Sequence, residues 1–257
     1  MPYTRHFALV ISWIFLFSLS FKGLSNPLVQ TGHISMVDSI DCCQNYIPKN
    51  KLLGHYNPAQ DTNFVLIPSY MAYRKNLYCH REAYNAFCAM RRAAQKEGIK
   101  LVVVSATRTF NDQKHIWDRK WKEHNKNTYT DTTMDIRTVR SIMRYSSMPG
   151  TSRHHWGTEL DLNSTKLEYW RTSEGVRAYK WLSKNASKYG YYQPYNANKE
   201  RTGYAEEKWH WSYRPIADIY LAAYTQLISG KDIEGFYGSY LVDSLNIISS
   251  HVLGVAQ

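Results

Sequence analysis

The chain has 257 residues, of which 44% are hydrophobic and 21% are charged, and these values exclude a wholly disordered or collagen-like protein. Lysine and arginine number 32 against 21 acidic residues, which gives a formal net charge of +11. A basic balance favours anionic partners, but it does not choose among nucleic acid, anionic polymers and membrane headgroups. The length allows one large domain or two small ones.

Residues 1–25 have the order of a secretory signal. Arg5 precedes a nearly unbroken apolar run over residues 7–21, and small residues come before Asn26. The run of about 15 residues is short for a membrane helix, which needs ~20, and an uncleaved N-terminal anchor is the alternative. No later run of the sequence is apolar enough to cross a bilayer. We therefore expect an exported protein of the periplasm or cell envelope, without a stable membrane span after signal cleavage.

Four cysteines are too few for a disulfide-dense scaffold in a chain of this length. The adjacent Cys42 and Cys43 leave open a single bridge to Cys79 or Cys88 in an oxidising compartment. The sequence has no CxxC motif, so it does not support a zinc site built from thiolates.

Apolar spacing predicts strands and helices that mix along the chain. The predicted strands cover residues 63–68, 100–105, 158–163 and 208–213, and the predicted helices cover 80–97, 111–123, 134–145, 173–189, 216–228 and 239–249. Because these elements do not alternate strictly as βαβ units, the predicted class is α+β. The predicted organisation is a signal over 1–25, a polar lead-in over 26–60, one main domain over 61–228 and a helical tail over 229–257.

Three of these segments carry more detailed expectations. One apolar stripe of the first helix is expected to face a core, and it consists of Ala83, Phe87, Met90 and Ala94. In the strand 158–163, Leu160 and Leu162 alternate with polar residues, which predicts a half-buried strand. Asn111 is the expected N-cap of the second helix.

Two histidines and two acidic residues suggest a metal site. His154 and Asp161 lie on either side of Gly157, which lets the chain turn so that their side chains converge. His210 lies on a later predicted strand, and Glu207 shares its face only if the chain bends between them. Two histidines and one carboxylate are a common ligand set of catalytic zinc sites, with the fourth position open. Glu207 is then left as a base beside the metal-bound water.

A third cluster, residues 105–110, places Arg108 at the C-terminal end of a predicted strand. A cation there could hold a developing oxyanion or a substrate carboxylate. Each cluster also has a purely structural interpretation. A single His and Asp at this spacing is a weak signal, a Trp-His-Trp strand is often core packing, and Arg108 could form a surface ion pair. His155 is expected either to support the ligands from behind or to be structural, because neighbouring side chains point apart.

The motifs in their order resemble the zinc D,D-carboxypeptidases of the VanY type. The resemblance spans residues 77–213, and the residues that carry it are Ser152, His154, Gly157 and Asp161, then Glu207, Trp209 and His210, with Arg108 and Gln113 upstream. It implies an α+β fold in which helices flank a small antiparallel sheet, shared with the N-terminal domain of Hedgehog proteins. It also implies that one zinc ion is ligated by His154, Asp161 and His210, that Glu207 is the general base, that Arg108 holds the substrate or its oxyanion, and that Gln113, Ser152 and Trp209 line the substrate site.

Two positions depart from the pattern of that family. Thr107 stands where a tyrosine is common before the arginine. Glu159 stands where a small residue, often alanine, is usual. A second carboxylate on the same strand face as Asp161 would crowd the metal unless the Glu159 side chain is turned away.

The resemblance implies a metallopeptidase that hydrolyses the D-Ala-D-Ala end of peptidoglycan stem peptides with metal-activated water. Within the same class, an L,D-carboxypeptidase, a D,D-dipeptidase and a peptidoglycan endopeptidase stay open. The alternative outside the enzymes is a zinc-containing module that binds the cell wall without catalysis. The presence of Glu207 argues against it, because a protein that only binds does not need the general base. A nucleic-acid partner is not expected, because the sequence has no recognised binding motif. The sequence does not specify an oligomeric state.

Overall fold

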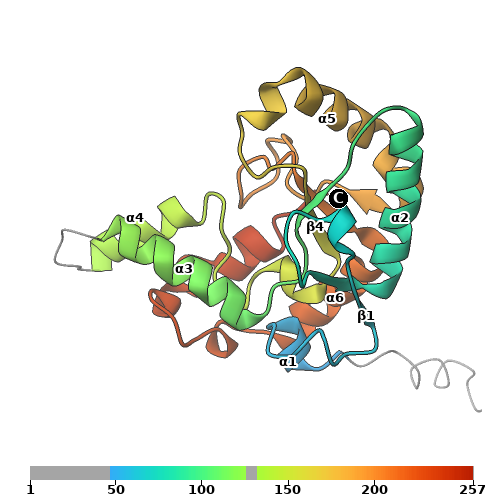
Figure 1. Ribbon diagram of the computed structural model, residues 1–257. Coiled ribbons are helices and arrows are strands. Elements are labelled where there is room, and N and C mark those ends of the chain that lie inside the picture. The colour runs from blue at the N-terminus through green and yellow to red at the C-terminus, as the bar shows by residue number, and fades with distance from the viewer. Residues whose placement is uncertain (1–46, 126–131, 257) are drawn as a thin grey trace, which may run out of the picture. The chain divides into compact units, whose positions relative to one another are not determined.

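A four-stranded antiparallel sheet carries most of the predicted strands in this computed structural model, which describes residues 47–125 and 132–256 (Figure 1). In the order in which they pair, the strands are β3 (Val103–Ser105), β4 (Glu159–Leu162), β6 (His210–Tyr213) and β5 (Tyr191–Tyr192). A separate antiparallel pair is formed by β1 (Phe64–Leu66) and β2 (Tyr78–His80). The expected signal over residues 1–25 and the Cys42–Cys43 pair lie outside the described residues.

Five of the described α-helices fall on predicted segments, with ends that shift by a few residues. They are α2 (Arg81–Lys96), α3 (Phe110–His124), α4 (Thr132–Ile142), α5 (Ser173–Asn185) and α6 (Arg214–Leu227). The short helix α1 (Lys49–Leu52) lies instead in the segment predicted as a polar lead-in. Figure 1 shows α3 and α4 lying against each other, and α2 lies beside β1 and β2. Helices together with small antiparallel sheets confirm the predicted α+β class.

The register of the sheet places three polar residues side by side on neighbouring strands. Asp161 on β4 lies opposite Ser105 on β3 and opposite His210 on β6. Because side chains alternate along a strand, Asp161 and Glu159 point to one face of β4, whereas Leu160 and Leu162 point to the other. The strand pairing therefore explains why residues about 50 positions apart in the sequence meet.

Two apolar clusters hold the described chain together. The first lies on the apolar face of the sheet and includes residues of β4, β6, α2 and α5. All four residues of the predicted α2 stripe, Ala83, Phe87, Met90 and Ala94, belong to it and are fully buried. The second cluster joins residues of α1, α3, α4 and α6 with the segment after Ser229. Each large apolar side chain buried in this way stabilises the fold by ~1.5–3 kcal/mol.

The prediction of a half-buried strand over residues 158–163 is wrong. All four residues of β4 are buried, including Glu159 and Asp161. The reason is that β4 lies between β3 and β6, and that its polar face is covered by the 3₁₀ turn Arg153–Trp156. Buried carboxylates need partners, and these partners form the site described below.

The predicted N-cap of α3 is also wrong. Thr109, not Asn111, precedes the helix in an extended conformation, and its hydroxyl accepts a hydrogen bond from the Asp112 backbone N–H. The Asp112 carboxylate accepts from the Thr109 N–H in return. This reciprocal capping box starts the helix at Phe110, directly after Arg108.

Residues 47–60 of the predicted lead-in and residues 229–256 of the predicted tail belong to the same compact unit as the predicted main domain. On the N-terminal side, Leu52 of α1 is fully buried. On the C-terminal side, the predicted helix over 239–249 is wrong, because that segment forms a 3₁₀ turn at Ser239–Leu241 and a short π-helix at Ile248–Val252. Asn246 has a φ of +50°, a left-handed conformation that interrupts a helix between them.

The π-helix carries a histidine that should make stability depend on pH. Burial lowers the pKa of His251 to about 4, against ~6.5 in an unfolded chain. The unfolded state therefore binds more protons between these values, so stability is complete above pH ~6.5 and falls as the pH decreases towards 4, by at most ~1.4 kcal/mol per pH unit. Urea unfolding at pH 7, 6 and 5 should show a shallower pH dependence for His251→Gln than for the wild type. Equal slopes would contradict this assignment.

Gly157 joins the 3₁₀ turn to β4, and its replacement should be costly. Its φ is +74°, and an added Cβ would lie 2.2 Å from Cε1 of Phe64. We expect Gly157→Ala to lower the free energy of unfolding by ~2–4 kcal/mol, from backbone strain together with overpacking. Gly235 has a φ of +85° with nothing within 4 Å of an added Cβ. Gly235→Ala should therefore lower the free energy of unfolding only by the cost of backbone strain, ~1 kcal/mol. Similar losses in urea unfolding of the two variants would exclude the Phe64 clash.

Two further features bear on the sequence-based expectations. Cys79 is buried and its thiol donates to the Gly157 carbonyl oxygen at 3.3 Å, and neither Cys79 nor Cys88 forms a disulfide within the described residues. Among the described helices, none has the length and apolar character needed to cross a membrane.

Candidate metal centre

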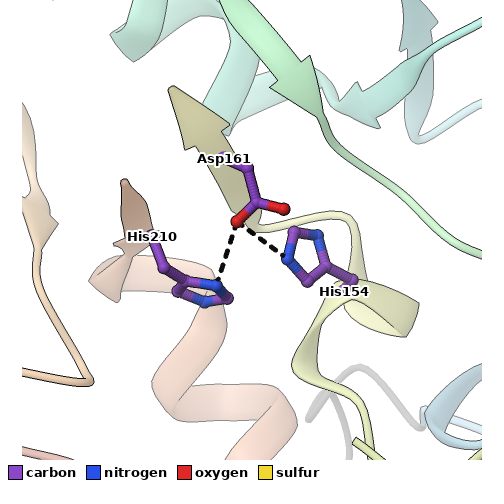
Figure 2. Close-up of side chains that lie close together, drawn as sticks. All are labelled: His154, Asp161 and His210. Atoms are coloured by element: carbon purple, nitrogen blue, oxygen red, sulfur yellow. Dashed lines mark ion pairs between the residues drawn. The ribbon is translucent and has the colours of Figure 1, made fainter. Parts of the chain in front are cut away.

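Three side chains predicted as zinc ligands converge at one end of the sheet, as Figure 2 shows. His154 comes from the 3₁₀ turn, Asp161 from β4 and His210 from β6. Asp161 Oδ1 lies 3.4 Å from His154 Nε2 and 3.3 Å from His210 Nδ1. All three residues are buried, and one potential ligand atom from each lies within 4.8 Å of the others.

The outer contacts of the two histidines select which nitrogen faces the centre. His154 Nδ1 lies 2.6 Å from the Ala106 carbonyl oxygen, which leaves Nε2 for the centre. His210 Nε2 lies 2.7 Å from Glu159 Oε2, which leaves Nδ1 for the centre. Hydrogen bonds of this kind fix the tautomer and the ring orientation of metal-binding histidines.

The inward atoms fit a cation. Within the described chain, His154 Nε2 and Asp161 Oδ1 are buried and have no hydrogen-bond partner. Buried polar atoms are rarely left unpaired in a folded protein, so the site calls for a ligand. Two imidazole nitrogens and one carboxylate oxygen are a donor set that suits zinc.

The protonation of the centre follows from burial and charge. Burial, together with the Arg108 charge, lowers the pKa of His154 to about 4, so this ring is neutral at pH 7. Although burial opposes it, the carboxylates of Asp161 and Glu159 raise the pKa of His210 to about 9. A metal ion bound at His210 Nδ1 must therefore replace a proton, so metal binding weakens as the pH falls.

Glu207 lies next to the three residues without being one of them. The chain bends where the His210 N–H donates to the Glu207 carbonyl oxygen, and Glu207 Oε2 lies 3.5 Å from His210 Nδ1. Burial raises the pKa of Glu207 to about 7, although the neighbouring His210 charge opposes this shift. A carboxylate with a pKa near neutrality is suited to accept and return a proton.

Two cavities meet at this centre. A small one of about 20 Å³ is lined in part by His154, His210 and Glu207, which is room for about one water molecule or ion. A larger cleft of about 670 Å³ is lined by Asp161 and Glu207 and opens to solvent. Trp209 and Arg108 also line the larger cleft.

Arg108 is held in place from two sides. Its Nη2 donates to Asp161 Oδ2 at 3.2 Å, and its Nη1 donates to Gln113 Oε1 at 2.7 Å. Gln113 in turn donates to the Ser147 carbonyl oxygen at 2.7 Å. Gln113 is fully buried, so it acts on the cleft by holding the Arg108 side chain and does not line the cleft itself.

The remaining predicted residues have different positions. Ser152 is buried and does not line the larger cleft, so its role in substrate binding stays a prediction. His155 is structural, as expected: its Nδ1 lies 2.7 Å from the Arg108 carbonyl oxygen, and its Nε2 accepts from the Gly150 N–H at 3.0 Å. This ring therefore fixes the backbone beside Arg108.

Sequence reasoning missed the other cations of the cleft. Arg74, Arg119 and Lys120 line it together with Arg108, and Lys120 Nζ donates to Ser146 Oγ at 2.6 Å. Lys120 lies seven positions after Gln113 on the same helix, two turns further along one face. That helical spacing was the one signal that could have placed Lys120 in the site.

Two histidines and an aspartate that converge, with a separate carboxylate and an open cleft beside them, are an arrangement typical of metal-dependent hydrolases. The family model described as VanY, D-alanyl-D-alanine carboxypeptidase, matches residues 76–216. This match covers more than half of the chain, and the chain belongs to that family.

Two relatives and one solved structure are similar to this chain. A D-alanyl-D-alanine carboxypeptidase of Enterococcus faecalis (strain ATCC 700802 / V583) is 31% identical over 47% of this chain and 42% of its own length. YodJ of Bacillus subtilis (strain 168) is 30% identical over 70% of this chain and 65% of its own length. The chain thus spans less than two thirds of either relative. The solved structure of VanYB in complex with D-alanine-D-alanine is 26% identical, with a TM-score of 0.48 over 66% of this chain and 87% of that one.

Proposed function

We propose that this protein is a zinc D,D-carboxypeptidase that removes the terminal D-Ala from peptidoglycan stem peptides ending in D-Ala-D-Ala. The observation that carries the proposal is the convergence of His154, Asp161 and His210, with the Glu207 carboxylate beside them at the cleft. Membership of a family described as D-alanyl-D-alanine carboxypeptidases supports the substrate.

The chemistry divides between the metal and the chain. Zinc, when bound, supplies a Lewis acid that activates water and polarises the scissile carbonyl. Glu207 accepts the proton of that water at its carboxylate and returns it to the leaving amine. Arg108, held by Gln113, presents its guanidinium to the cleft and stabilises the negative charge that develops on the carbonyl oxygen.

The charge of the cleft suits an anionic substrate. Its lining holds four cations, Arg74, Arg108, Arg119 and Lys120, against three carboxylates, Asp161, Glu168 and Glu207, and a stem peptide carries free carboxylates. Opposite charges steer such a substrate towards the cleft, and this attraction weakens with salt. An exported enzyme of the cell envelope meets this substrate, and the signal-like sequence over residues 1–25 supports that location.

A substrate panel tests the proposal. The purified protein with zinc is incubated with a stem pentapeptide ending in D-Ala-D-Ala, a tetrapeptide ending in one D-Ala, the free D-Ala-D-Ala dipeptide and a cross-linked stem dimer. Mass spectrometry measures the products. We expect the pentapeptide to lose one D-Ala at a rate well above the rate at which any of the other three substrates is cleaved. A preference for the tetrapeptide, the dipeptide or the cross-link would instead identify an L,D-carboxypeptidase, a D,D-dipeptidase or an endopeptidase. Binding of the pentapeptide without any cleavage would identify a binding module.

A further inference from the structure

Glu159 has a fully buried carboxylate, which contacts His210 on the side of the ring that faces away from the candidate metal centre. Its Oε2 lies 2.7 Å from Nε2 of His210, the nitrogen that faces away from Asp161. The strand register explains this contact: Glu159 pairs with Ser212 in the sheet, one step along the same face from the pair of Asp161 and His210. The carboxylate is therefore turned away from the three ligand atoms and does not crowd them.

The other oxygen of Glu159 is bound by a cluster of donors. Oε1 accepts from Ser212 Oγ at 2.7 Å and lies 3.2 Å from Nη2 of Arg153, whose side chain is also fully buried. The Arg153 guanidinium and the Ser212 hydroxyl thus compensate this oxygen, while His210 contacts the other. A buried carboxylate is stable only with such compensation.

We propose that Glu159 is a positioning residue for the metal ligand His210: its carboxylate accepts the Nε2–H, fixes the ring with Nδ1 towards the centre, and is balanced in charge by Arg153. This inference rests on the proposed function, because it requires that the site binds zinc. A carboxylate behind a metal-binding histidine raises the basicity of the ligand and orients its ring, and removing it typically weakens metal binding 10- to 100-fold.

A competing explanation is that Glu159 serves only as the counter-ion of Arg153. Two double variants separate the explanations, because both remove the Arg153 charge. Arg153→Met with Glu159→Met leaves His210 Nε2 without an acceptor. Arg153→Met with Glu159→Gln keeps an amide oxygen that can accept the Nε2–H. The positioning role predicts that these two variants differ, whereas the counter-ion role predicts that both recover the zinc affinity of the wild type.

The measurement is the zinc dissociation constant of the full chain, determined by competition with a chromophoric chelator. Circular dichroism reports whether each metal-free variant is folded. We expect a 10- to 100-fold weaker affinity for the variant with two methionines, and recovery of most of that loss with glutamine at position 159. Tyr192→Phe is the matched control, because it removes a different partner of Arg153, a hydroxyl at 3.0 Å, and leaves the carboxylate in place. Its zinc affinity should stay within about threefold of the wild type.

Each other outcome counts against the inference. Equal zinc affinities for the two double variants, whether strong or weak, would overturn it. Loss of folding in both double variants would make Glu159 a structural residue and would overturn it as well. A wild-type protein that binds no zinc would overturn the proposed function and this inference together, whereas zinc binding by the wild type with unchanged affinity in the variants would overturn the inference alone.

Discussion

Replacing Glu207 with glutamine is expected to lower kcat for D-Ala release by about 10²- to 10⁴-fold, while the protein still binds zinc. Glutamine keeps the size of the side chain but cannot accept the proton of the attacking water. Zinc should stay bound because the three residues that form the ligand cluster, His154, Asp161 and His210, are unchanged. The measurement combines steady-state kinetics on the pentapeptide with the metal content of the purified variant.

Glu206 provides a matched control for this variant. It is the adjacent acidic residue, and its Oε1 accepts from the Tyr179 hydroxyl at 3.2 Å instead of approaching His210. Glu206→Gln should therefore change kcat by less than about threefold, since the residue lies outside the catalytic centre. Turnover of Glu207→Gln near that of the wild type would refute the role of Glu207 as base, and loss of zinc from that variant would make Glu207 a ligand.

Replacing His154 with alanine is expected to abolish both zinc binding and D-Ala release. Within the described residues, His154 offers one of the three candidate ligand atoms that converge, and its Nε2 faces the centre because its Nδ1 is engaged by the Ala106 carbonyl oxygen. Loss of a direct ligand should weaken zinc binding by more than the ~10- to 100-fold typical of residues behind the ligands. Equilibrium dialysis against zinc measures the effect, with kinetics on the same samples.

An exposed histidine provides the control for this second variant. His115 lies on the solvent-exposed side of α3, so His115→Ala removes an imidazole without touching the centre. This variant should bind zinc as the wild type does, which excludes non-specific binding to surface histidines. Retention of tightly bound zinc by His154→Ala would mean that the ligand set is different from the one proposed.

The sequence was sufficient to predict the elements that bury one clear apolar face. The stripe on α2 and the alternation in β4 each place their apolar residues towards one cluster, as the structure shows for Phe87 and Leu160. The approach of His154, Asp161 and His210 was also predicted, through a resemblance in motif order that single motifs would not have supported. The apolar patterns are local, so a single sequence contains them, whereas the site prediction depended on the order of motifs along the chain.

What could not be predicted depends on contacts between distant segments. The burial of both faces of β4 requires knowledge of its two neighbouring strands and of the turn that covers it. The direction of Glu159 depends on Arg153, Ser212 and His210 acting together, so the sequence left open whether this carboxylate would crowd the metal. The start of α3 was misplaced because Thr109 and Asn111 are both good capping residues, and only the reciprocal bond to Asp112 decides between them.

The most direct test of the central claim is to measure the zinc content of the purified protein together with D-Ala release from the pentapeptide, before and after treatment with a chelator. We predict about one zinc ion per chain, loss of D-Ala release when the chelator removes it, and recovery when zinc is restored. The metal-free protein should remain folded, so that the loss of activity reports the metal and not the fold. Release of D-Ala that continues unchanged after complete removal of the metal would contradict the account.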